Sequence, residues 1–125
     1  MQNSQNNKFD LEERTTNFAK RVIVLCRALP KDPINNRLTG QAVGSAGSVG
    51  ANYREANDAL GKKDFLHRLR ISRKEAKEVM HWLECIETAN PVFVSRMQEI
   101  KQEAKELKFI LSSIISKTEE KNRGD

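Results

Sequence analysis

The residues with the clearest chemical potential are the basic ones that gather between positions 61 and 77. Seven lysines and arginines stand there against two acidic residues, Asp64 and Glu75. They are Lys62, Lys63, Arg68, Arg70, Arg73, Lys74 and Lys77. Because phosphate contacts need only positive charge and reach, this segment predicts a surface that binds a nucleic-acid backbone. A solvated helix face without a ligand stays open as the alternative, since no aromatic stacking platform and no base-reading motif is evident.

A metal centre is the second chemistry to consider, because Glu78-Val-Met-His81 is a Glu-x-x-His step. A di-iron bundle needs that step on two helices and a further Glu from each of the other two, and only one step is present. His81 and Cys85 stand four residues apart, but no second pair completes a tetrahedral site. No Ser-His-acid or Cys-His arrangement is signalled. We therefore expect no metal, no cofactor and no enzymatic activity.

Glycines recur between positions 40 and 50, where each costs up to about 1 kcal/mol relative to Ala in a helix interior. Neither GxxxxGK[ST] nor GxGxxG occurs, so a phosphate-binding loop is not indicated. The spacing of Gly40, Gly44, Gly47 and Ala51 instead predicts a smooth face for close helix approach, within one chain or between subunits. The wider predicted subunit interface adds Val43, Gly50, Tyr53, Phe109 and Ile110.

The elements that must position these residues are four helices. Apolar residues recur at alternating steps of four and three, and the pattern breaks only at Pro30 to Pro33, at Gly61 and at Asn90-Pro91. Asp10 and Glu13 form a capping-box pattern at the first helix, and Gly61 is a natural C′ residue for the second. Four stripes joined by short loops predict an all-α, antiparallel up-down-up-down four-helix bundle over 9–118. Residues 1–8 and 119–125 are expected to be a disordered tail and a frayed tail.

Pairing the stripes as antiparallel neighbours places every stripe residue in a layer with one residue from each helix. Phe18, for example, shares a layer with Val49 and two alanines, which balances side-chain volume. One layer is polar and contains Thr15, Asn52 and Ser72. We expect their hydroxyls to bond the Asn52 amide, because a lone buried amide would be costly.

Length and composition limit the number of domains and the compartment in which the protein is expected. At 125 residues the chain suits one domain, and its net charge of +5 matches the surplus of the segment 61 to 77. The start of the chain is polar and resembles no signal peptide, and no apolar run is long enough to span a bilayer. We expect a cytoplasmic protein with no membrane partner. Cys26 and Cys85 then serve as reduced, space-filling thiols.

The stretch from Gln41 to Ala89 resembles the four-helix-bundle proteins encoded in intervening sequences of bacterial 23S rRNA genes. The matching features are Ser-Val-x-x-Asn-x-x-Glu-Ala from Ser48 to Ala56, Asp64-Phe65, Lys74-Glu75-Ala76, Glu78 and Trp82-Leu83. The resemblance implies a left-handed bundle, often a homopentamer. Related bundles are accessory subunits of diversity-generating retroelements. The resemblance implies that such subunits bind the reverse transcriptase and nucleic acid. Gly44 stands where many members carry Arg in an RSA run.

Together these observations predict a non-enzymatic oligomeric bundle. Its partners are expected to be further copies of itself and RNA, DNA or a nucleoprotein, bound through the basic segment. The alternative from a different class is a purely structural self-assembling protein with no nucleic-acid role.

Overall fold

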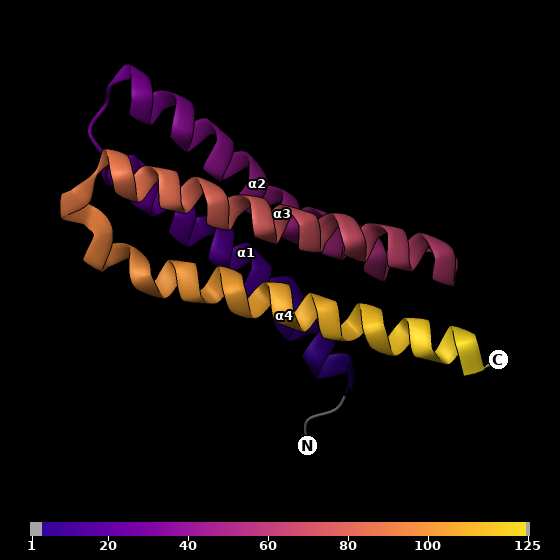
Figure 1. Ribbon diagram of the computed structural model, residues 1–125. Coiled ribbons are helices and arrows are strands. Elements are labelled where there is room, and N and C mark those ends of the chain that lie inside the picture. Colours follow the sequence, from indigo (N-terminus) through magenta and orange to yellow (C-terminus); the bar gives the residue numbers. More distant parts are fainter. Residues whose placement is uncertain (1–3, 125) are drawn as a thin grey trace.

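The computed structural model describes residues 4–124, which form four long helices (Figure 1). They are α1 (Ser4–Ala28), α2 (Pro33–Asn57), α3 (Lys62–Ala89) and α4 (Val94–Gly124), with a short 3-10 helix η1 (Pro91–Phe93) before α4. No strand occurs in the described part of the chain. The expected all-α, four-helix class is therefore confirmed.

Helices α1 and α4 extend into the two segments expected to be tails. Helix α1 already begins at Ser4, so Asp10 lies inside the helix and does not cap it. Helix α4 continues to Gly124, through most of the segment expected to fray. Residues 1–8 contain neither proline nor glycine, and the one glycine of 119–125 is Gly124 at the end of α4, so no helix breaker precedes these helix ends. Residues 1–3 and Asp125 lie outside the described residues.

The breaks between helices use clear local signals. Asp32 has extended backbone and its side chain accepts a hydrogen bond from the Asn35 backbone N–H at 2.8 Å, while Pro33 takes the first helical position. Gly61 is not the C′ residue of α2 that its sequence position suggests. Asp58 is the C-cap of α2, and Gly61 instead takes the extended N-cap position of α3.

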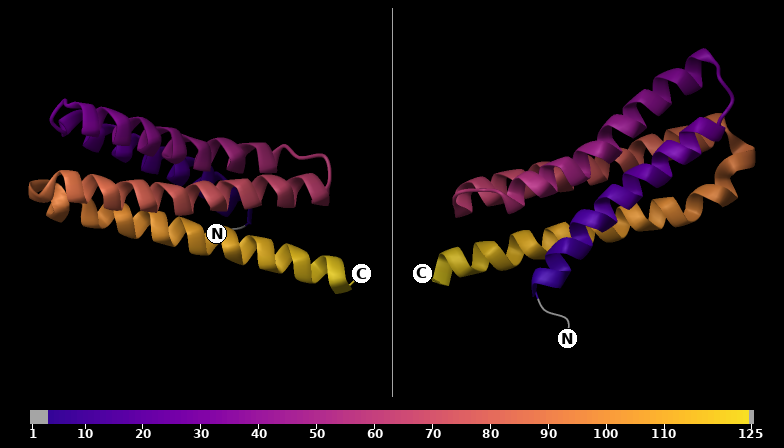
Figure 2. Two further views of the ribbon diagram at one scale, coloured as in Figure 1. Left: turned by 45° about the horizontal axis from the view of Figure 1, so that its top comes forward. Right: turned by 180° about the vertical axis from the view of Figure 1, so that it is seen from behind.

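Contacts between helices bring the start of one beside the end of its neighbour. Arg54 near the end of α2 donates to Glu12 near the start of α1 at 3.1 Å, and Arg70 of α3 pairs with Glu119 near the end of α4. Neighbouring helices thus run in opposite directions, joined by short turns (Figure 1). Helix α1 crosses the others obliquely, and its N-terminal end stands away from the α2–α3 turn (Figure 2).

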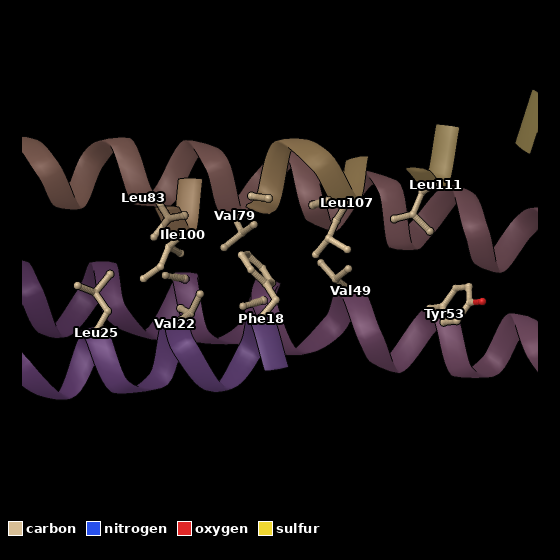
Figure 3. Close-up of a cluster of buried hydrophobic side chains, with 14 of the residues drawn as sticks. Phe18, Val22, Leu25, Val49, Tyr53, Val79, Leu83, Ile100, Leu107 and Leu111 are labelled. Carbon is tan, nitrogen blue, oxygen red and sulfur yellow. The ribbon is translucent and has the colours of Figure 1, made fainter. Parts of the chain in front are cut away.

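The core lies between the four helices and contains the predicted stripes (Figure 3). Phe18, Val49, Ala76 and Ala104, expected in one layer, are all buried. The buried set is wider than the stripes, however. It also includes Ala46, Tyr53, Leu66 and Ile115, while Leu38 and Phe93 at one end of the bundle are only partly buried.

The polar layer forms differently from the expectation. Thr15 and Ser72 are buried, but the Thr15 hydroxyl donates to the Glu12 carbonyl at 3.0 Å and the Ser72 hydroxyl to the Val49 carbonyl at 2.7 Å. Asn52 is only half-buried, and its amide donates to Ser48 instead. The expected contact between these hydroxyls and the Asn52 amide is wrong. Gly50 faces Thr15 in place of Asn52, since a Cβ on Gly50 would lie 2.9 Å from the Thr15 Oγ1.

Candidate nucleic-acid interface

A groove of about 540 Å³ runs along the outer side of α3. Four of the seven predicted basic residues line it, together with one carboxylate and two rings. We call it the α3 groove, and its lining residues are Arg70, Arg73, Lys74, Lys77, Glu78, His81 and Trp82. These positions recur every three or four residues, so one helix presents them all along its length.

The two arginines of the α3 groove are held against α4. Arg70 forms its ion pair with Glu119, and the Arg73 Nη1 donates to the Ser112 Oγ at 3.5 Å. Lys74 and Lys77 are exposed, and within the described residues neither forms an ion pair. The groove therefore combines two braced guanidinium groups with two ammonium groups that reach into solvent. Such a set suits an extended polyanion.

The aromatic end of the α3 groove was missed by sequence reasoning. The rings of His81 and Trp82 meet edge to face with centroids 4.7 Å apart. Trp82 is half-buried and packs against the core, whereas His81 is exposed and its Nε2 lies 3.8 Å from the Cys85 Sγ. The spacing of positions 70, 74, 77 and 81 is the signal that could have joined the rings to the charges.

The remaining predicted cations lie elsewhere. Arg68 donates to the Asn52 Oδ1 at 3.3 Å and so faces α2, because that helix is packed directly against α3. Lys62 and Lys63 are exposed at the start of α3. The structure therefore divides the predicted patch, and four of its residues share one groove while Lys62, Lys63 and Arg68 do not.

A second hollow, the apolar groove, lies where α1 stands away from the α2–α3 turn. It has a volume of about 1010 Å³ and is lined mainly by apolar side chains from α1, α2, α3, the turn and α4, among them Leu11, Tyr53, Leu60, Phe65, Ile110 and Ile114. Arg14 and Lys117 lie among its lining residues with Lys62, and no described carboxylate does. Leu60 on the turn is fully exposed.

Arg14 is strongly bound to α4. Its guanidinium donates to both oxygens of Glu103, at 2.6 and 2.8 Å, and to Glu106 at 2.7 Å. These hydrogen bonds, that to Glu103 above all, raise the pKa of Arg14 above its ordinary value. The contact fixes α1 on α4 beside the apolar groove.

The candidate metal ligands do not assemble. Among the described residues, no group of three or more His, Cys, Asp or Glu side chains could hold a metal ion. Both cysteines are free thiols. Burial raises the pKa of the Cys26 thiol to about 11, so this group stays protonated at neutral pH.

Only part of the predicted subunit interface lies on the surface of the chain. Gly40, Gly44 and Gly47 are exposed, and a Cβ added to any of them would meet nothing within 4 Å. The three glycines therefore face outward and not toward another helix of the chain. Phe109 is 56% exposed, and Val43 and Ile110 are half-buried.

Gly50 and Tyr53 are buried inside the chain, and their assignment to an outer interface is wrong. Helix α2 packs against α1 on one side and α3 on the other, so its buried face is wider than a single stripe. Tyr53 lies at the end of the buried cluster with its hydroxyl pointing away from it (Figure 3). Burial raises the pKa of this phenol.

Comparison with known families matches residues 7–113 to the model for the 23S rRNA-intervening sequence protein. The chain belongs to this family. A crystal structure from Bacteroides thetaiotaomicron, described as a protein of unknown function from the S23 ribosomal protein family, is similar. It shares 29% sequence identity with a TM-score of 0.76, and the match covers 87% of this chain and 97% of that one. No curated protein matches the chain.

Two further features concern this member of the 23S rRNA-intervening sequence family. A Cβ added at Gly44, where the sequence comparison with the family suggested an arginine, would meet nothing within 4 Å. Packing within the chain therefore does not require a glycine at this position. Among the described residues, no helix is long and apolar enough to cross a membrane.

Proposed function

We propose that this chain is a non-enzymatic, self-associating helical bundle that binds a nucleic-acid backbone, free or within a nucleoprotein, through the α3 groove. The observation that carries the proposal is the alignment of Arg70, Arg73, Lys74 and Lys77 along one groove, whose lining includes one carboxylate, while within the described residues Arg70 alone of the four is paired with a carboxylate from α4. Four cations at helical spacing can contact successive phosphates without reading sequence.

The bracing of the arginines supports this function over a plain solvated face. Arg70 and Arg73 reach α4 and hold their positions on the groove wall, so less side-chain freedom is lost when a phosphate binds. The exposed Lys74 and Lys77 then supply mobile charge. A solvated face would not need its cations gathered around a hollow.

The test is a salt series of RNA and DNA binding. Lys74→Gln with Lys77→Gln should lower the magnitude of the slope of log affinity against log salt by about 1.4 on single strands, for two lost phosphate contacts. The matched control is Lys20→Gln with Lys105→Gln, which removes the same charge from exposed positions on α1 and α4. A slope lowered equally by both double variants would mean that only net charge matters. Absence of binding at low salt would contradict the proposal.

A purely structural assembly protein is the second candidate, and the outward glycines of α2 favour it. Gly40, Gly44 and Gly47 leave a surface on which a helix of another subunit could approach closely. Light scattering should give a mass above that of one chain, and Gly44→Glu should lower it while the far-ultraviolet circular dichroism is retained. A strictly monomeric wild-type protein would remove self-association from both candidates. Binding to no nucleic acid, with assembly intact, would leave the structural role.

A further inference from the structure

We infer that the α3 groove takes a single strand and stacks one unpaired base on the His81–Trp82 ring pair, while its cations hold the preceding phosphates. The inference rests on the proposed function and deepens it by naming the class of nucleic acid. Its basis is the continuity of one groove from Arg70 to the two rings.

The order of residues along α3 separates two kinds of contact. From position 70 to 77 the lining is basic, then comes the carboxylate of Glu78, and then the rings of His81 and Trp82. Glu78 repels a phosphate placed beside the rings but can accept a hydrogen bond from a base amino group. Phosphates are thus favoured at the basic end and a base at the aromatic end.

The dimensions agree with a short stretch of extended strand. Positions 70 and 81 are eleven steps apart along the helix, a rise of about 16 Å, which spans a few nucleotides. Bases stack on aromatic side chains without regard to sequence, because every base has a π face.

A duplex cannot use the aromatic end in the same way. Its bases are already stacked on one another, and the deep groove of an A-form helix does not admit side chains to them. A duplex would therefore contact only the cations. The groove should distinguish strands by whether a base is free to stack, which a row of lysines alone could not do.

Trp82 is the only tryptophan of the chain, so intrinsic fluorescence reports on this groove directly. The full-length protein is titrated with three probes: an unstructured RNA 12-mer, the same 12-mer annealed to its complement, and an abasic strand of equal charge. We expect the 12-mer to quench the fluorescence, because a stacked base contacts the indole. The abasic strand and the duplex should bind without comparable quenching.

Variants then separate stacking from charge. His81→Ala should weaken binding of the unstructured 12-mer about tenfold and leave binding of the abasic strand unchanged. The matched control is His67→Ala, which removes the other histidine of α3 from an exposed position outside the groove. Trp82→Phe should keep most of the affinity for the 12-mer, whereas Trp82→Leu should lower it toward the affinity for the abasic strand, with folding of both variants checked by thermal denaturation.

The outcomes distinguish the two proposals. Equal quenching and equal affinity for the 12-mer, the duplex and the abasic strand would overturn base stacking and leave backbone binding intact. If His81→Ala weakened binding of the abasic strand as much as binding of the 12-mer, base stacking would also be overturned. Binding to none of the three probes at low salt would overturn both proposals.

Discussion

Asn35 and Asn90 exchange two side-chain hydrogen bonds inside the bundle, although 55 positions separate them. The Asn35 Nδ2 donates to the Asn90 Oδ1 at 2.9 Å, and the Asn90 Nδ2 donates back to the Asn35 Oδ1 at 2.8 Å. The second proton of each amide reaches a backbone carbonyl, that of Pro30 or Ile86. Both residues are buried, and the pair ties the start of α2 to the end of α3.

Breaking this amide pair should be costly. Asn90→Ala leaves the Asn35 side chain buried with an unsatisfied oxygen, so we expect the free energy of unfolding to fall by about 2 kcal/mol. Urea denaturation measures it. Asn36→Ala is the matched control, because Asn36 is exposed in the same turn. Similar losses in the two variants would show that the pair contributes nothing specific.

The glycines of α2 should respond to alanine in opposite ways. Gly44→Ala meets open space and should raise the free energy of unfolding by up to about 1 kcal/mol through helix propensity. Gly50→Ala places a methyl group 2.9 Å from the Thr15 Oγ1 and should cost about 1 to 3 kcal/mol through overpacking. Thermal denaturation of both variants is the measurement. Equal shifts would contradict the close approach of α1 and α2 at Gly50.

The ion pair between Arg14 and Glu103 should be measurable, unlike most surface pairs. It is bidentate and the Glu103 side chain is only 16% exposed, so a double-mutant cycle should give about 1 kcal/mol of coupling. Arg21 and Glu99, 3.6 Å apart with the Glu99 side chain 93% exposed, provide the control. Their coupling should be close to zero, and equal values would refute the distinction.

The two thiols should differ in reactivity. The thiolate is the nucleophile, and burial raises the pKa of Cys26 to about 11. Cys85 is half-buried, so at pH 8 an alkylating reagent should modify it well before Cys26, as followed by mass spectrometry. Comparable rates at the two positions would contradict the burial of Cys26.

The same shift makes stability depend on pH. Between about pH 9 and pH 11 the unfolded thiol loses its proton while the folded one keeps it, so the free energy of unfolding should fall as pH rises. Urea denaturation at several pH values measures the fall. It should be smaller in Cys26→Ala, and an identical pH profile in that variant would assign the effect to other groups.

Much of the fold could be predicted because core packing repeats along the chain. The spacing alone places Phe18, Val49, Ala76 and Ala104 in one layer, and all four are buried. The helix ends were harder to predict. Asp10 matches a capping pattern, but α1 continues through it because helix extension depends on the residues before it as well.

The contacts that depend on three dimensions escaped prediction. Asn90 directly precedes Pro91 and Asn35 lies two residues after Pro33, both near a helix break where Asn is ordinarily a local cap. Nothing in either segment indicates the other as its partner. The basic half of the α3 groove was predictable from local charge. Trp82, in contrast, falls at the helical spacing of partly buried positions, and this spacing indicates only that the side chain packs against the core.

The apolar groove and the Asn35–Asn90 pair occupy opposite ends of the helices, which gives the molecule a tight end and a loose end. At the tight end, side-chain hydrogen bonds join both helix connections. At the loose end, α1 stands away from the α2–α3 turn, and Leu60 contributes nothing to the core. Amide hydrogen exchange should be slowest around Ile86 and fastest around the α2–α3 turn. The bundle would then open from the groove end first, by partial unfolding well below the global transition.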